Sequence, residues 1–454
     1  MTQPGDRPYD IVGVGFGPAN LALAVALEEH NARAAPADRL SAVFVERQPR
    51  FGWHRGMLIE GATMQVSFLK DLVTLRDPAS GFTFLSYLKE KGRLVDFINH
   101  KTFFPTRVEF HDYLSWAAAR VGHFVRYGTE AVSAAPVEDG VDGVDGEGGV
   151  TGFAVTVRDA SGAESVLRAR DLVIGGGLRP SLPEGVEASE RVWHNRDLLT
   201  RLAEYDGPPP ARWTVIGAGQ SAAEVADHLH RAYPDAEVCA IFARYGYSPA
   251  DDSPFANRIF DPAAVDDFHG APEEVKERLL DYHRGTNYSV VDLDLIEELY
   301  RRSYQEKVRG RERLRILNAC RVLEVRERPG GVRTTYEFLP TGERHELDSG
   351  VVICATGYRP YDVLGLLGPA AGLCERDERG RVRVERDYRI RTVPGVRAGI
   401  YLQGGTEHTH GITSSLLSNG AVRAGEILGS LLAARRAGPP APRSAAEARE
   451  LAVG

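Results

Sequence analysis

The chain has 454 residues, a formal net charge of −8 and 43% hydrophobic residues. This length allows two or three domains with a sizeable core, and an acidic balance without a large basic block argues against nucleic acid as a partner. No apolar run approaches the roughly 20 residues that a membrane helix needs, so we expect no membrane contact.

The first eight residues are polar and lack the apolar core of a signal peptide, which predicts a cytoplasmic protein. A buried strand is predicted at residues 11–14, followed by a glycine turn and a helix at 21–29. Gly13 and Gly15 stand at the first two positions of the dinucleotide fingerprint, where backbone approaches a pyrophosphate at a helix N-terminus. Pro18 replaces the third glycine, which a first helical turn tolerates. Taken alone, such a turn is equally consistent with an ordinary loop.

The next predicted strand, residues 41–46, ends in Glu46. A carboxylate at that strand end hydrogen-bonds ribose hydroxyls and repels a ribose phosphate, so it fits the adenosine half of FAD or NAD. The acid lies farther from the turn than the usual spacing of about 20 residues. The polar, alanine-rich segment 31–39 can form the extra loop.

Residues 64–72 place Gln65 and Lys70 around an apolar segment, so Lys70 can point into a cleft. A solvated surface lysine is the alternative, because lysine is rarely buried. Gln65 is equally consistent with a polar group at a strand end. Residues 140–152 are rich in glycine and aspartate, which predicts an exposed loop.

A second strand, glycine turn and helix follow a proline-rich linker at 207–210. Gly217 and Gly219 hold the first two fingerprint positions and Ala222 the third, a known variant. The next strand runs to Arg244 instead of an acid. An arginine there matches a ribose 2′-phosphate, which favours NADPH over NADH. An unrelated surface arginine is the alternative.

One acidic and one basic strand end predict two different dinucleotides, FAD first and NADPH second. The predicted fold is α/β: a Rossmann-like FAD domain with an inserted Rossmann-like NADPH domain and a small helical substrate region. We expect the FAD domain at 1–205 and 346–435, the NADPH domain at 206–345 with substrate-region helices at about 250–310, and a mobile tail at 436–454.

Neither cysteines nor histidines form a pattern typical of a metal site. The four cysteines are far apart, without a CxxC pair, and we expect buried thiols at Cys239, Cys320, Cys354 and Cys374. His408 and His410 are close in sequence, but no third ligand clusters with them, and zinc sites use three or four ligands. We therefore predict no metal.

From about residue 9 to about residue 432, the sequence resembles the flavin-dependent N-hydroxylating monooxygenases of siderophore biosynthesis, most of all the L-ornithine N5-monooxygenases, with L-lysine N6-monooxygenases as relatives. The resemblance rests on residues 10–20, 51–55, 64–71, 215–224, 251–257, 287–292, 355–358 and 410–418. One departure is His-Gly-Ile-Thr-Ser-Ser at 410–415, where many ornithine enzymes have His-Gly-Leu-Ser-Asp. This leaves lysine or a diamine open as the substrate, whereas the retained Leu-Leu-Ser at 416–418 mildly favours ornithine.

The resemblance implies FAD and NADPH as cofactors, L-ornithine and O2 as reactants, a flavin hydroperoxide as the oxygenating species, and a homo-oligomer, either a tetramer or a dimer. It implies that Gly13, Gly15, Gly17, Pro18 and Glu46 hold FAD, with Trp53, His54, Gln65 and Arg107 near the flavin or its phosphates. NADPH would be held by Gly217, Gly219, Gln220, Ser221 and Arg244. The amino acid would contact Lys70, Asn257, Asn287 and Ser418, with Gln65 and Asn287 as catalytic residues.

The implied reaction needs an amine with a free lone pair, yet a free alkyl amine titrates near about 10.4. A neighbouring carboxylate would stabilise the cation, whereas Asn287 is uncharged. Lys70 can pair with the substrate α-carboxylate, and we hypothesise that it selects amino acids over diamines. We also hypothesise that Gln65 hydrogen-bonds the nicotinamide or flavin edge and limits release of H2O2.

Three other classes share part of this pattern. A flavin disulfide reductase needs a cysteine pair beside the flavin, but no cysteine precedes Cys239. A flavin monooxygenase acting on sulfur, tertiary amines or ketones carries Phe-x-Gly-x-x-x-His, which residues 192–195 do not match. A redox-sensing nucleotide-binding protein would explain the two turns, but not the set of Lys70, Asn257 and Asn287.

Overall fold

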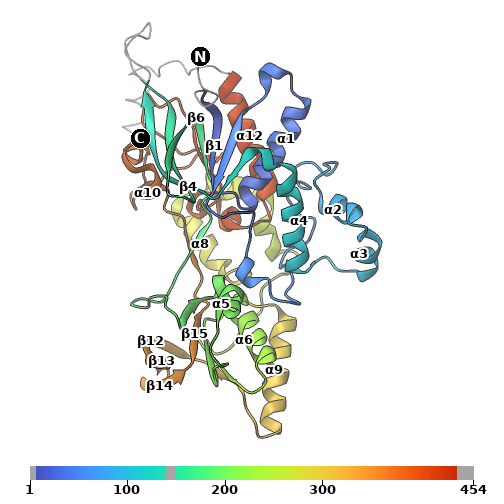
Figure 1. Ribbon diagram of the computed structural model, residues 1–454, viewed down its shortest axis with the longest axis vertical. Helices are drawn as coiled ribbons and strands as arrows, with labels where there is room; N and C mark the ends of the chain where they lie inside the picture. Colours follow the sequence, from blue (N-terminus) through green and yellow to red (C-terminus); the bar gives the residue numbers. More distant parts are fainter. Residues whose placement is uncertain (1–6, 139–148, 437–454) are drawn as a thin grey trace.

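The structure is a computed structural model that describes residues 7–138 and 149–436. Outside the described residues lie the first six residues, most of the predicted loop at 140–152, and all but one residue of the predicted tail. The chain forms two α/β bodies, one above the other in Figure 1. We call the upper one the FAD body and the lower one the NADPH body, after the cofactors that the sequence predicts for them.

The FAD body is built on a seven-stranded sheet in the order β3-β2-β1-β6-β5-β4, with β17 also paired to β6 (Figure 1). Strands β1, β2, β3, β6 and β17 run parallel, whereas β5 runs antiparallel to its two neighbours, β4 and β6. Parallel strands are buried on both faces, which explains the continuous apolar runs of β1 and β2. The strands are β1 (Tyr9–Val14), β2 (Ala42–Glu46), β3 (Val125–Tyr127), β4 (Thr129–Glu138), β5 (Val150–Asp159), β6 (Glu164–Ile174) and β17 (Ile400–Leu402).

Helices cover the FAD sheet, with α1 (Pro18–Arg33) and α12 (Gly420–Arg436) packed side by side (Figure 1). They share one apolar core with α4 (Arg107–Arg120), which supplies Phe110 and Tyr113. The short helices α2 (Phe84–Glu90) and α3 (Leu94–His100) project from this side of the body. The second core of the sheet is covered by α10 (Val363–Leu367).

The NADPH body has a parallel sheet in the order β11-β10-β9-β15-β8. Edge strand β8 and its neighbour β15 lie outside 206–345, so this sheet extends beyond the range predicted for the NADPH domain. The antiparallel pair β7–β16 lies where the chain passes between the bodies. The strands are β7 (Leu178–Pro180), β8 (Val192–His194), β9 (Arg212–Ile216), β10 (Glu237–Ile241), β11 (Leu314–Leu317), β15 (Val351–Cys354) and β16 (Tyr358–Pro360), with a separate antiparallel sheet of β12 (Cys320–Arg328), β13 (Gly331–Phe338) and β14 (Glu343–Ser349).

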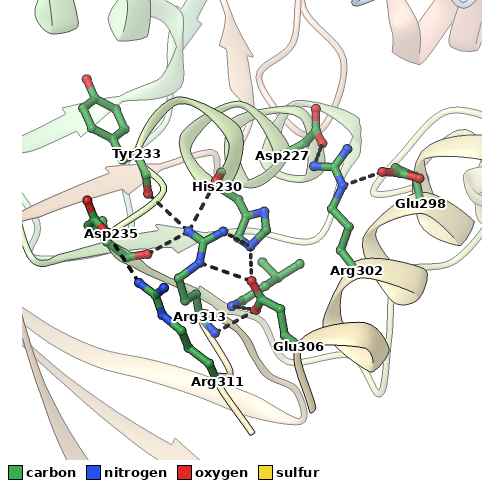
Figure 2. A network of polar contacts seen from close by, with 11 residues as sticks. Asp227, His230, Tyr233, Asp235, Glu298, Arg302, Glu306, Arg311 and Arg313 are labelled. Atoms are coloured by element: carbon green, nitrogen blue, oxygen red, sulfur yellow. Dashed lines mark hydrogen bonds and ion pairs between the residues drawn. The ribbon is translucent and has the colours of Figure 1, made fainter. Parts of the chain in front are cut away.

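Helix α9 is fixed to helix α6 by a polar network that Figure 2 shows. The carboxylate of Glu306 lies 2.7 Å from the His230 ring and also accepts from the backbone N–H of Arg313 at 2.7 Å. Arg302 pairs with Asp227 at 2.7 Å. The network holds the second half of α9 against α6 and the chain that follows it. The helices here are α5 (Leu198–Glu204), α6 (Gln220–Ala232), α7 (Pro262–Gly270), α8 (Glu273–Tyr282), α9 (Leu293–Val308) and, in the last FAD segment, α11 (Glu407–His410).

Two further predictions concern the chain as a whole. None of the helices in the described residues combines the length and hydrophobicity needed to cross a bilayer. All four cysteines are free, and all four are buried, as the sequence predicted.

Candidate active site

The first glycine turn is closed by the acid at the end of β2. Gly15 has φ +80°, and a Cβ there would lie 2.5 Å from the carbonyl oxygen of Gly175, so the turn requires glycine. The carboxylate of Glu46, which is only 8% exposed, accepts from the backbone N–H groups of Phe16 at 2.8 Å and Gln48 at 2.9 Å. The predicted acid and the predicted turn therefore meet.

The N-terminus of α1 fits a dinucleotide pyrophosphate. Gly17 is its N-cap, no side chain caps the helix, and a Cβ on Gly17 would meet nothing within 4 Å. Pro18 occupies the first turn. Uncapped backbone N–H groups facing open space are what an anion at a helix N-terminus uses. Nearby, Asn20 donates to the Gly15 carbonyl at 2.7 Å, while its buried Oδ1 atom has no partner among the described residues.

Aromatic and basic side chains lie downstream of this turn. The rings of Trp53 and His54 meet edge to face at 4.5 Å, and Trp53 also packs on Phe110. The protein packed around the His54 ring, together with the charge of Arg107, lowers its pKa to about 4. A neutral His54 beside these aromatic rings can donate or accept a hydrogen bond without adding charge.

The second glycine turn repeats the plan in the NADPH body. Gly217 has φ +137°, and a Cβ there would collide with the Ala355 carbonyl. Gly219 is the N-cap of α6, again without a side-chain cap, so this helix also presents free N–H groups. Arg244, beyond the end of β10, is exposed and donates to the Ser289 carbonyl at 2.8 Å. Ser221 lies half-buried in the first turn of α6.

Lys70 and Asn257 belong to neighbouring parts of the structure. The Lys70 ammonium lies 5.7 Å from the centre of the Phe260 ring, one residue before Asp261. Burial lowers the pKa of Lys70, and the charge of Asp261 opposes that shift. Asn257 lies in the same short helical turn as Phe260, and its amide donates to the Asp252 carbonyl at 2.7 Å. A half-buried cation therefore faces the turn that carries the predicted amide.

Asn287 lies in residues 285–292, which we call the strap. The strap reaches both nucleotide-binding halves: a Cβ on Gly219 would lie 3.4 Å from Ser289, and Tyr288 donates to Glu407 in α11. Asn287 itself is half-buried. Ser418, which ends the block that begins at α11, is 2% exposed. The strap thus brings the segment of Asn287 against the block that carries Ser418.

Two acids that the sequence analysis did not select connect the predicted residues. Glu224 in α6 pairs with Arg107, and Asp292 in the strap accepts from Gln65 at 2.7 Å and from Gln220 at 3.1 Å. Burial raises the pKa of Asp292, and its hydrogen bonds from the two glutamines oppose the shift. The sequence did hold a signal, because both acids lie inside segments that carry the family resemblance, at 215–224 and 287–292.

A second set that sequence reasoning missed lies at the start of α12. The buried side chain of Asn419 has no hydrogen-bond partner for either amide atom among the described residues. One turn on, buried Arg423 donates to Gln403 at 2.8 Å, and Gln403 donates to the Ala19 carbonyl in α1 at 3.2 Å. A buried amide left unpaired is unfavourable, so Asn419 fits a site that a polar ligand completes. The sequence showed only that Asn419 is a polar residue directly before α12.

The two histidines of the same block bind the backbone. A ring nitrogen of His408 lies 2.8 Å from the Val382 carbonyl, and one of His410 lies 3.2 Å from the Arg386 carbonyl. Within residues 7–138 and 149–436, no group of three or more His, Cys, Asp or Glu side chains could hold a metal ion.

Comparisons with known proteins agree with this geometry. Residues 7–360 match the family model described as L-lysine 6-monooxygenase/L-ornithine 5-monooxygenase. An L-ornithine N(5)-monooxygenase of Burkholderia cepacia is 42% identical over 89% of this chain and 90% of its own length, and an L-ornithine N(5)-oxygenase of Arthrobotrys oligospora is 41% identical over 94% and 89%.

Solved structures show the same similarity over nearly the whole chain. An ornithine N-hydroxylase of Kutzneria sp. 744, in a complex with reduced FAD, NADP+ and L-ornithine, superposes with a TM-score of 0.89 at 48% identity, covering 95% of this chain and 100% of that one. The ornithine hydroxylase of Pseudomonas aeruginosa has a TM-score of 0.87 at 36% identity, covering 94% and 100%.

Proposed function

The chain belongs to the L-lysine 6-monooxygenase/L-ornithine 5-monooxygenase family, and from this premise we propose that it hydroxylates the side-chain amine of L-ornithine. It is an FAD-, NADPH- and O2-dependent monooxygenase, and its product is N5-hydroxy-L-ornithine for a hydroxamate siderophore or a related natural product. The observation that carries the choice of substrate class is Lys70, a half-buried cation facing the turn of Asn257.

The two uncapped helix N-termini fit two dinucleotides, one in each body. The chemistry that FAD supplies when bound is acceptance of a hydride from NADPH and activation of O2. We assign FAD to Gly13, Gly15, Gly17, Pro18 and Glu46, with Trp53, His54, Gln65 and Arg107 near it. We assign NADPH to Gly217, Gly219, Gln220, Ser221 and Arg244.

The protein's own task is to hold the amine neutral and in place. Because Asn287 carries no charge, it can orient the amine without stabilising the cation, as a carboxylate would. Lys70 pairs with the α-carboxylate at the other end of the substrate. We assign the amino acid to Lys70, Asn257, Asn287 and Ser418, and we assign catalytic roles to Gln65 and Asn287.

One assay tests the substrate. NADPH oxidation and hydroxylamine formation are measured side by side with ornithine, lysine and putrescine. We expect hydroxylamine with ornithine in near-equal amounts to NADPH consumed, and little with the other two. If hydroxylamine formed mainly with lysine or putrescine, that compound and not ornithine would be the substrate. A purified chain that takes up no flavin would refute the proposed function.

Lys70→Ala tests the amino acid site. We expect the KM for ornithine to rise at least about tenfold, since a hydrogen bond to a charged group contributes about 1.5–3 kcal/mol. FAD content should stay unchanged. Lys89→Ala, at an exposed position in α2, is the matched control. An unchanged KM in Lys70→Ala would remove this residue from the substrate site.

We propose that the enzyme is a homo-oligomer, a tetramer or a dimer. Support comes from apolar side chains exposed on α3 and the loop after it, where Val95 is 68%, Ile98 61% and Phe103 59% exposed. Exposed apolar side chains gathered in this way are typical of a protein–protein contact. Sedimentation should show a multimer that Ile98→Glu dissociates, and a monomeric wild type would refute the assembly.

We also propose that the enzyme works in the cytoplasm. Its four cysteines are free thiols, as expected in a reducing compartment. Fractionation of cells that produce the protein should recover it with cytoplasmic markers, and recovery with a secreted or membrane fraction would contradict this assignment.

A further inference from the structure

A continuous series of hydrogen bonds leaves the FAD body, crosses the NADPH body and returns. It starts at Arg107, the first residue of α4, whose guanidinium donates to both carboxylate oxygens of Glu224 at 2.8 and 2.7 Å. Gln220, one turn earlier in α6, donates to Glu224 at 3.1 Å and to Asp292 at 3.1 Å. Asp292 then accepts from Gln65, which lies back in the FAD part of the chain, at 2.7 Å.

The ion pair in this series is buried. The side chain of Arg107 is 11% exposed and that of Glu224 is 5% exposed. Burying two charges gains little net stability over an apolar contact, because both lose their hydration. A bidentate arginine–carboxylate pair does fix relative orientation, since two parallel hydrogen bonds allow only a narrow range of angles. The pair is therefore better suited to setting the positions of α4 and α6 than to stabilising the fold.

Asp292 orients two glutamine side chains at once. Its Oδ2 atom accepts from the Nε2 groups of both Gln65 and Gln220, and its backbone N–H donates to the Oε1 atom of Gln220 at 2.8 Å. With its Nε2 group turned to Asp292, Gln65 keeps its Oε1 atom as an acceptor. The carboxamide of a nicotinamide ring offers N–H donors for such an acceptor.

We propose that Arg107, Glu224, Gln220, Asp292 and Gln65 form an inter-body bridge that sets the position of the NADPH body over the FAD body for hydride transfer. This inference rests on the proposed function. Glu224 and Asp292 are positioning residues in it, because they act through the arginine and the glutamines. Hydride transfer requires the two rings in near-contact, so a small displacement of one body lowers its rate strongly.

The test separates the rate of flavin reduction from binding. Glu224→Gln keeps the side-chain shape and removes the charge. In anaerobic stopped-flow experiments without ornithine, we expect flavin bleaching by NADPH to slow at least about tenfold, with the NADPH dissociation constant changed less than about threefold and FAD content unchanged. Glu298→Gln is the matched control, because it breaks an ion pair with Arg302 in the same body but away from the bridge.

A second readout needs no bound cofactor. In the flavin-free protein, hydrogen exchange in the strap at 285–292 should rise in Glu224→Gln and in Asp292→Asn, and stay at the wild-type level in Glu298→Gln. The double variant Glu224→Gln/Asp292→Asn should slow flavin reduction by less than the product of the single effects, because both changes open one bridge.

Two outcomes are distinguishable. If NADPH does not bleach the flavin of the wild type, the proposed function fails. If the rates of flavin reduction by NADPH in the wild type and in both bridge variants agree within a factor of about two, the bridge is overturned while the proposed function stands. Should Glu224→Gln fail to fold, Asp292→Asn alone carries the test, since Asp292 lies at the half-exposed end of the bridge.

Discussion

The two glycine turns share one plan of strand, turn and helix, but they are closed differently. In the FAD body, buried Glu46 closes the turn from within by accepting from the backbone N–H of Phe16. In the NADPH body, exposed Arg244 reaches outward and holds Ser289 of the strap. A turn closed by its own strand suits a cofactor that stays bound. A turn covered by a separate segment suits a cofactor that enters and leaves.

The largest effect should come from the glycines of the first turn. Gly15→Ala forces a left-handed conformation on a side chain that also meets the Gly175 carbonyl, so we expect at least about 100-fold weaker FAD binding. Gly17→Ala meets no protein atom, so the fold should persist while FAD binding weakens about tenfold, because the methyl group occupies space at the helix N-terminus. Flavin absorbance per chain, with circular dichroism as the control for folding, measures both.

Each of the two glycine variants has an outcome that would contradict the prediction. If Gly17→Ala bound FAD as tightly as the wild type, the space in front of α1 would not be the pyrophosphate site. If Gly15→Ala bound FAD normally, the turn would tolerate a side chain that the geometry excludes.

Acid should affect the two bodies unequally. Burial lowers the pKa of His410 to about 3. Between pH 6.5 and pH 3 the His410 ring is therefore protonated in the unfolded chain but neutral in the native protein. Stability is therefore lost as the pH falls from 6.5 toward 3, by about 2 kcal/mol between pH 7 and pH 5. In the NADPH body, burial also lowers the pKa of His230, but Glu306 at 2.7 Å opposes the shift.

Urea unfolding at pH 7 and pH 5 measures this difference. His410→Gln should reduce the loss of stability between the two pH values by about 2 kcal/mol, whereas His230→Gln should change it much less. An equal effect of the two substitutions would show that the carboxylate beside His230 gives no protection.

Arg244→Ala should affect one nucleotide and spare the other. We expect the KM for NADPH to rise about tenfold, the equivalent of about 1.4 kcal/mol, because the lost charge pair is exposed and partly screened. The KM for NADH should change less than about twofold, since NADH lacks the 2′-phosphate. Arg309→Ala, at an exposed position after α9, is the control. Equal effects on both nucleotides would assign Arg244 to holding the strap only.

The same contrast explains what could be read from the sequence. The places of Gly15, Glu46 and Arg244 in the fold could be predicted, because each belongs to a local strand–turn–helix pattern. For Glu224 and Asp292 the sequence marked only the segments that carry the resemblance. Their roles arise from contacts between distant segments: Gln65 and Asp292 are 227 residues apart, and Arg107 and Glu224 are 117 apart. Asn419 became visible only when its burial showed an amide without a partner.

The smallest effect should come from Gln65, where the two halves meet. Gln65→Ala leaves both turns intact and removes one contact to Asp292, so FAD content and the KM for NADPH should stay within about twofold of the wild type. If the Oε1 atom of Gln65 orients the nicotinamide or flavin edge, its loss should raise H2O2 released per NADPH about two- to threefold, because one neutral hydrogen bond contributes about 0.5–1.5 kcal/mol. Hydroxylamine and H2O2 measured in the same reaction test this. Unchanged H2O2 would leave Gln65 with a purely positional role, through its hydrogen bond to Asp292.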